Sequence, residues 1–184
     1  RVDSEGMSPN LAMMVALILG VYLLFFTNSM GEWGRELDKP YLYLAPCPPF
    51  QKLLWASMTS LIKPLIDGAI AFSLAGAVGG ASALTILMCI LLYAAFGALF
   101  TAANLLSQRL LGRVANQGLL MVLYMLLLVI LAAPGLIAGV VLGVFTEGIL
   151  PGAVMGAPVV LWNLLAACGI FAFCRNTLHD MEVR

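Results

Sequence analysis

Five long apolar runs constrain this sequence more than any other feature. They cover residues 11–27, 65–82, 84–106, 119–144 and 153–173. A helix crosses a bilayer with about 20 mostly apolar residues, within a range of about 17–25. Because lipid offers no hydrogen bonds, such runs are stable in a membrane as helices that satisfy their own backbone groups. The sequence therefore predicts an all-α integral membrane bundle of about five transmembrane helices, forming a single transmembrane domain over residues 1–184.

The composition agrees with a membrane environment. Hydrophobic residues make up 62% of the chain and charged residues 10%, and the mean hydropathy is +1.04. A soluble domain has about 25% charged residues. The formal net charge is zero, which gives no indication of a nucleic-acid partner. The four cysteines form no CxxC pair or Cys/His cluster, so we expect no metal site.

The second run is preceded by an amphipathic segment. Apolar residues recur there at intervals of three and four: Phe50, Leu54, Met58, Leu61, Ile62 and Leu65. This pattern is typical of a helix lying in the membrane interface, with Trp55 at the headgroup level. We expect the helix to bend at Pro64 into the second span. Asp67 lies near the start of that span, and Lys63, four residues earlier, could pair with it.

Basic residues indicate the orientation. Eight of the nine Lys and Arg residues fall on one side of a five-span arrangement. The positive-inside rule makes that side cytoplasmic. The prediction is a multi-pass membrane protein with the N-terminus outside and the C-terminus in the cytoplasm. No signal-peptide cleavage pattern follows the first run, which we interpret as a retained span.

Groups for catalysis are scarce. The chain has one histidine, His179, and no GxSxG, HExxH or Walker-type motif. Asp67 is the one acid within the predicted spans, so a paired-carboxylate site is not expected. The sequence predicts that the protein is not an enzyme and binds no cofactor itself. An intramembrane enzyme that depends on Asp67 is the least favoured interpretation.

Small residues suggest close helix packing. Gly135, Gly139 and Gly143 form a tandem GxxxG pattern, and Gly76 and Gly80 repeat the spacing. Glycine at these intervals lets helix backbones approach closely. We favour contacts within the chain over a dimer interface.

Three residues of the last two spans have two interpretations. Pro134 and Pro158 remove helix hydrogen bonds, so they indicate a hinge on a transport path or kinks that neighbouring helices satisfy. Asn163 is the most deeply placed polar residue, and it indicates either a helix-to-helix hydrogen bond or a pathway lining.

The segment from residue 34 to residue 50 combines charges, aromatics and prolines on the predicted cytoplasmic side. An ordinary connector needs no alternation of tyrosine and leucine such as that at residues 41–44. Exposed aromatics with mixed charges favour docking against a partner.

The stretch ELDKPYLYLAPCPPFQKLLWASMTSLIKP resembles the "EL-KPY-YLIP--PF-KLL" segment of the "putative ABC exporter" family of Gram-positive bacteria, a relative of ABC-2-type permeases. The resemblance covers roughly Met7 to Val144 and is weaker beyond. It departs from the family pattern at Ala45 and Cys47. Members of the family are longer, and this chain starts at Arg1, so we expect it to be the C-terminal part of a permease.

The resemblance implies a permease subunit of an ATP-driven exporter, with ATP bound by a separate ATPase subunit. It also implies that a short cytoplasmic helix, here within residues 39–63, passes ATPase closure to the membrane helices. The residues expected at the ATPase contact are Glu36, Tyr41, Tyr43, Phe50 and Lys52. The other expected partners are the lipid bilayer and either a second copy or an N-terminal half. The alternative is a non-transporting membrane scaffold or immunity-type protein that only binds partners.

Overall fold

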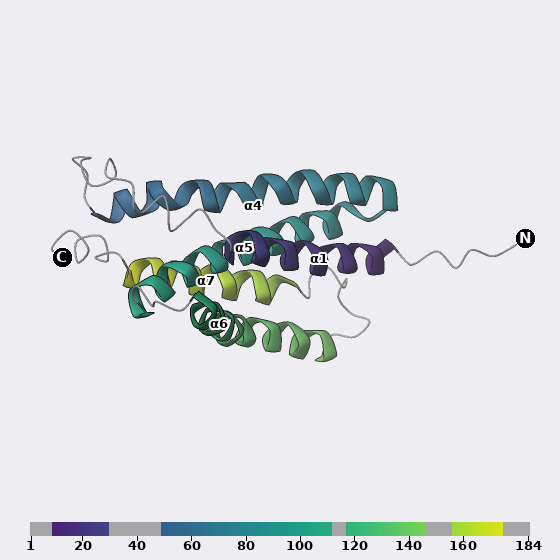
Figure 1. Ribbon diagram of the computed structural model, residues 1–184. Helices are drawn as coiled ribbons and strands as arrows, with labels where there is room; N and C mark the ends of the chain where they lie inside the picture. The colour runs from purple at the N-terminus through teal and green to yellow at the C-terminus, as the bar shows by residue number, and fades with distance from the viewer. Residues whose placement is uncertain (1–8, 30–48, 112–116, 146–155, 175–184) are drawn as a thin grey trace, which may run out of the picture.

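The computed structural model describes residues 9–29, 49–111, 117–145 and 156–174. These residues form five helices, with no strand in the described ranges: α1 (Pro9–Ser29), α4 (Pro49–Gly79), α5 (Ala83–Leu111), α6 (Gln117–Phe145) and α7 (Ala157–Phe173) (Figure 1). The predicted all-α bundle is confirmed.

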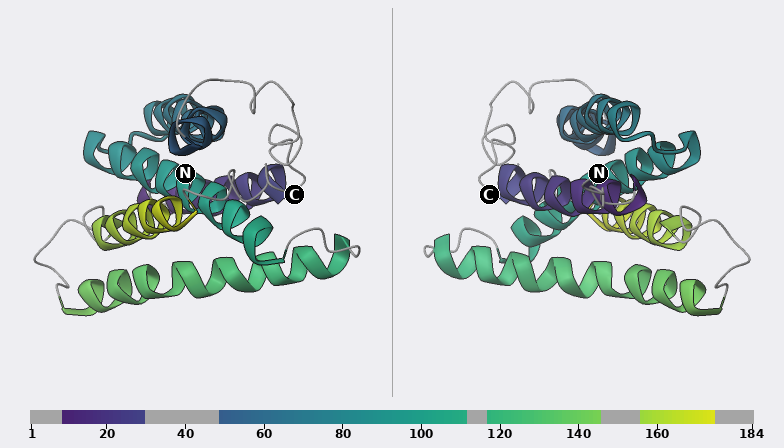
Figure 2. Two further views of the ribbon diagram at one scale, coloured as in Figure 1. Left: turned by 90° about the vertical axis from the view of Figure 1, so that its left-hand side faces the viewer. Right: turned by 90° about the vertical axis from the view of Figure 1, so that its right-hand side faces the viewer.

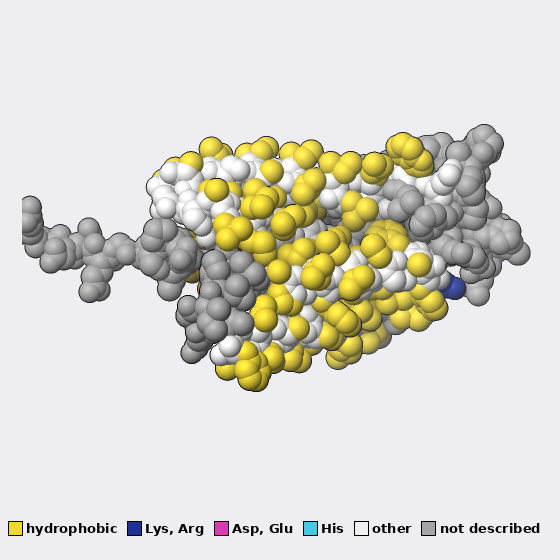
Figure 3. All heavy atoms as spheres, turned by 180° about the vertical axis from the view of Figure 1, so that it is seen from behind, with side chains coloured by type: hydrophobic (Ala, Val, Ile, Leu, Met, Phe, Trp, Pro, Cys, Tyr) yellow, Lys and Arg dark blue, Asp and Glu magenta, His cyan; other side chains and the backbone are white. Residues whose placement is uncertain are grey.

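Three of the helices are long and apolar enough to cross a membrane. The qualifying stretches are Ser60–Gly79 of α4, Ala83–Ser107 of α5 and Met121–Phe145 of α6. Shorter apolar stretches occupy Met13–Phe25 of α1 and Ala157–Phe173 of α7. Hydrophobic side chains cover the face seen in Figure 3, and the basic atoms visible among its described residues lie at one end. Such a surface suits hydrocarbon as the surrounding medium, and the chain is a membrane helical bundle.

Helix α5 is the centre of the bundle and contacts all four other helices. Helix α1 runs parallel to it, since Gly20 lies beside Tyr93 and Phe25 beside Phe100. Helix α4 runs antiparallel, with Gly76 beside Ile86 and Pro64 beside Gly97.

Helix α7 runs parallel to α5, because Gly156 lies beside Leu92 at one end and Phe173 beside Arg109 at the other. The first turns of α4 and the last turns of α5 and α7 therefore share one end of the molecule, which we call the Arg109 end (left in Figure 1). Figure 2 shows α4 and α6 on opposite sides of the layer that contains α7.

Three clusters of buried side chains hold the helices together. One joins α5 to α7 around Leu105 and Phe171. The second joins α1, α5 and α6, where the Phe25 ring stacks on Tyr124 at 6.0 Å between centroids. The third joins α1, α4 and α5, where Phe72 meets the edge of Tyr93 at 5.6 Å. Each cluster contains residues of α5, which explains its central place.

Helix α4 differs from the prediction of an interfacial helix followed by a bend. It is one continuous helix of 31 residues with Pro64 in its interior, and Figure 1 shows it as a single, nearly straight rod. Its buried face passes through the proline without a break, at Ser57, Pro64, Gly68, Phe72 and Gly76. Because one packing stripe continues on both sides of Pro64, tertiary contacts keep the helix intact where local propensity would bend it.

The end of α4 corrects the role predicted for Gly80. This residue has φ 67°, and a Cβ there would meet no other atom within 4 Å. The Ala81 N–H donates to the Gly76 carbonyl at 3.0 Å. A left-handed glycine followed by this bond is a Schellman cap, which satisfies a terminal carbonyl of the helix. Gly80 therefore ends α4, and within the described part of the chain it packs against no other helix.

Pro158 also has a different place from the one expected. Helix α7 begins at Ala157, so Pro158 lies in its first turn. The N–H groups of a first turn have no intrahelical acceptor, and a proline there removes no helix hydrogen bond. Pro158 therefore starts α7 and is not an interior hinge.

Candidate functional site

Of the five residues predicted for the ATPase contact, the structure describes the backbone of two, near the Arg109 end. Glu36, Tyr41 and Tyr43 fall outside the described residues. Phe50 and Lys52 belong to the first turns of α4, but their side chains are outside the described part of the structure. The first turns of α4 lie at the Arg109 end of the bundle, and the contact itself stays a prediction.

Arg109 links two helices at this same end. Its guanidinium donates to the Phe173 carbonyl and lies over the Phe173 ring, 4.6 Å from the centroid. The last carbonyls of a helix lack intrahelical donors and carry partial negative charge, so a cation there is stabilising; the ring adds a cation–π contact. In the sequence, Arg109 is one of the basic residues that indicate the orientation. A basic residue in a last helical turn signals such a cap, but the sequence does not tell which helix it caps.

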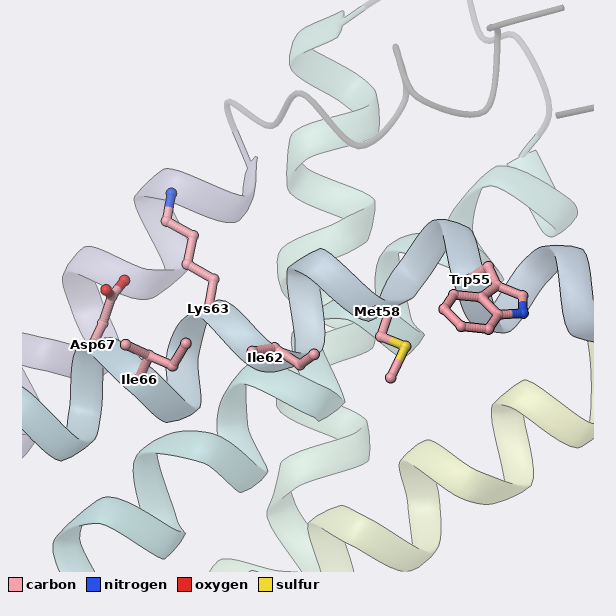
Figure 4. A pocket seen from close by; sticks show the side chains of 6 residues that line it. All are labelled: Trp55, Met58, Ile62, Lys63, Ile66 and Asp67. Atoms are coloured by element: carbon pink, nitrogen blue, oxygen red, sulfur yellow. The ribbon is translucent and has the colours of Figure 1, made fainter. Parts of the chain in front are cut away.

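The outer face of α4 carries an open groove of about 530 Å³. Its walls are apolar at Met58, Ile62 and Ile66, with Trp55, Lys63 and Asp67 completing the lining (Figure 4). Trp55 is 70% exposed. Lys63 and Asp67 are both exposed, and their side chains leave α4 on the same side.

The middle of α6 is the candidate hinge. Pro134 lies inside this helix and is exposed. Figure 1 shows the first half of α6 nearly end-on and its second half running across the view. The axis therefore bends within the helix, as an interior proline causes. The Trp162 indole N–H of α7 donates to the Leu131 carbonyl at 2.8 Å, one turn before the proline. A neighbouring helix thus supplies a donor where the backbone is distorted.

Asn163, the next residue on α7, is fully buried with 0% exposure. Neither its Nδ2 nor its Oδ1 has a hydrogen-bond partner among the described residues. Nearly all buried polar groups in proteins are paired, and an unpaired one raises the free energy of the fold. The structure places Asn163 deep within protein. It makes no helix-to-helix hydrogen bond among the described residues, and its role stays a prediction.

The interior glycines receive large side chains from neighbouring helices. A Cβ on Gly76 would lie 2.4 Å from Ile86 atoms, one on Gly97 would lie 2.6 Å from the Pro64 ring, and one on Gly135 would lie 2.9 Å from Trp162. All three contacts join helices of the same chain. Gly139 and Gly143 are half-buried on α6. The sequence analysis missed Gly97, because its partner is a proline more than thirty residues away.

Comparisons with known proteins give one family. The family model described as "Putative ABC exporter" matches residues 3–182. Searches of curated proteins and of solved structures found no match.

Proposed function

This chain belongs to the "putative ABC exporter" family, and from that premise we propose that it is the membrane-spanning permease subunit of an ATP-driven exporter in the bacterial plasma membrane. As a member it is a component of an ABC transporter, which works with an ATPase and a membrane. In the proposal a separate ATPase subunit binds and hydrolyses ATP at the Arg109 end, which faces the cytoplasm. The chain itself has no catalytic role and holds no cofactor.

The observation that carries the proposal is the continuity of α4. One helix runs from the Arg109 end to the opposite end of the bundle. It is fixed to the central helix by Pro64, whose ring fills the space above Gly97. A force on the first turns of a rigid helix moves its whole length, whereas an interfacial helix joined by a bend would absorb much of it.

The central position of α5 extends this argument. Because α5 contacts every other helix, a displacement of α4 reaches α1, α6 and α7 through a single neighbour. Closure of the ATPase against Glu36, Tyr41, Tyr43, Phe50 and Lys52 would thereby shift the bundle as a unit. The bent α6 and the unpaired Asn163 are the places where that shift would change packing.

The test is association with candidate ABC ATPase subunits from the same bacterium. We expect one of them to co-purify with the chain from membranes, and we expect the double variant Tyr41→Ala/Phe50→Ala to reduce the yield of bound ATPase about tenfold, since buried aromatic anchors dominate interface energetics. The matched control is Phe145→Ala, an exposed aromatic of α6 at the end of its helix, which should leave binding unchanged. Unaltered ATPase binding by the double variant would reject this contact surface.

One observation favours the alternative, a scaffold that binds partners without transport. The Trp162 indole donates to the Leu131 carbonyl beside the proline, so Pro134 can be accommodated by its neighbours without any role in transport. The two functions differ in ATP-dependent efflux from vesicles that contain both subunits. Efflux that disappears in Pro134→Ala or Asn163→Leu, with normal ATPase binding, would decide against a scaffold.

A further inference from the structure

The depth of two charges in α4 follows from where this helix ends. The left-handed Gly80 cap ends α4 at Gly79. A helix rises about 1.5 Å per residue and the hydrocarbon is about 30 Å thick, so the opposite boundary lies near Ser60, where the 20-residue apolar stretch begins. On this scale Lys63 lies about 5 Å inside the hydrocarbon and Asp67 about 10 Å inside.

The two charges differ in how they could reach water. A lysine near a helix end extends its amine to the interface on a flexible apolar stem. The aspartate side chain is too short to do so. Lys63 could neutralise it from the same helix, but no ion pair joins the two within 4 Å among the described residues, although both are exposed on one side of α4. Asp67 is left facing the surroundings of the bundle, and charges within spans generally face protein.

The neighbours of this pair form an unpartnered stripe. Lys63, Asp67, Ile70 and Leu74 follow each other at intervals of four, three and four residues, and all are exposed, Ile70 at 58% and Leu74 at 64%. This is the spacing of a seam between two parallel helices. The buried stripe of α4, from Ser57 to Gly76, occupies a different face, although Asp67 stays within electrostatic reach of Tyr93 on α5.

We propose that this seam packs against the same seam of a second copy of this chain, around a two-fold axis along the membrane normal. Two copies in one membrane share the same orientation, so their α4 helices run parallel and present equal residues at equal depth. Lys63 of each copy then lies one helical turn from Asp67 of the other, within reach of its long side chain. The two reciprocal ion pairs supply the partners that each copy lacks, and Ile70 and Leu74 continue the contact toward the far end.

Charge complementarity is what selects a second copy over lipid. Lipid tails offer nothing to Asp67, and a headgroup amine lies too far out to follow it into the hydrocarbon. An identical seam carries one acid and one base at the required spacing. The contact does not involve the residues of the ATPase surface, so the experiment can reject it without rejecting the proposed function.

The experiment exchanges charges between two differently tagged full-length copies expressed together, and it measures their co-purification from membranes. Lys63→Asp alone and Asp67→Lys alone each place four like charges in the seam, so each should lower association with itself about tenfold or more. The Lys63→Asp copy mixed with the Asp67→Lys copy restores both pairs, and association should return to the wild-type level. A misfolded variant would not recover on mixing, which separates folding from pairing.

The control places a charge elsewhere on the apolar surface. Val140→Lys on α6, a site that is 67% exposed, should leave association unchanged. The proposal is overturned if wild-type copies do not co-purify, or if each single variant associates as the wild type does. It is also overturned if association recovers only in a chain that carries both Lys63→Asp and Asp67→Lys. That result would mean that the two charges pair within one helix that faces lipid.

Discussion

Pro64 and Pro134 are both interior helix prolines, yet they differ in burial and in whether the helix axis bends beside them. Pro64 is buried, and its helix runs nearly straight through it. Pro134 is exposed, and its helix bends. The chemistry of the residue is the same in both helices, since each lacks an N–H and each ring crowds the preceding turn. The difference comes from what the neighbouring helix offers.

At Pro64 the neighbour offers a hollow. Gly97 of α5 has no Cβ, and the proline ring lies where that atom would be, so the contact is one of shape. At Pro134 the neighbour offers a hydrogen-bond donor, the Trp162 indole, which reaches the Leu131 carbonyl. Close packing admits one arrangement, because interiors do not deform continuously. A single hydrogen bond can be broken and made again. The comparison thus assigns rigidity to the α4–α5 contact and adjustability to the α6–α7 contact.

The largest expected effect is at the rigid contact. Gly97→Val would place two methyl groups where the Pro64 ring lies, and a Cβ alone already approaches it to 2.6 Å. We expect the free energy of unfolding to fall by about 3 kcal/mol, the upper end of typical overpacking costs. Urea or SDS unfolding of the detergent-solubilised chain measures the change.

Gly169→Ala is the matched control for this substitution. It is also an interior helix glycine, but a Cβ there would meet nothing within 4 Å. We expect Gly169→Ala to be neutral or to stabilise by about 0.5–1 kcal/mol, because alanine restricts the unfolded chain. Equal losses at both glycines would show that helix propensity, and not the Pro64 ring, sets the requirement at Gly97.

The sequence predicts the helices well, because hydrophobic length and spacing are local properties. All five predicted runs overlap helices. The bend at Pro64 was expected from the local rule for proline. The structure differs because burial of Ser57 and Phe72 on the same face is a tertiary property that the local rule does not contain.

Pairings between helices are the part that the sequence does not predict. Gly97 with Pro64, Trp162 with Leu131 and Arg109 with Phe173 each join residues that only the fold brings together. The predicted GxxxG at Gly76 and Gly80 has the right spacing, yet one glycine packs and the other ends the helix. Spacing alone cannot separate these roles, because it does not show where α4 ends.

An intermediate effect on the free energy of unfolding is expected at Asn163, beside the α6–α7 contact. Asn163→Leu removes the unpaired buried amide and keeps a side chain of similar size. We expect the free energy of unfolding to rise by about 1–2 kcal/mol, because water reaches the amide in the unfolded state but no partner does in the folded state. If α6 and α7 repack during transport, the more stable variant should also lose efflux. A variant that gains stability and keeps full efflux would make Asn163 irrelevant to the adjustable contact.

The smallest expected effect tests the hydrogen bond itself. Trp162→Phe removes the indole donor and keeps an aromatic ring against Gly135, so we expect a loss of about 1 kcal/mol or less, the usual size for a hydrogen bond between membrane helices. In a Pro134→Ala background residue 134 regains an N–H, which donates to the Ile130 carbonyl and relieves the backbone distortion beside Leu131. The same Trp162→Phe change should then have almost no effect. A double-mutant cycle measures this coupling. Coupling near zero would mean that the indole does not compensate for the proline, and the contrast between the two prolines would then rest on the shape of the Gly97 contact alone.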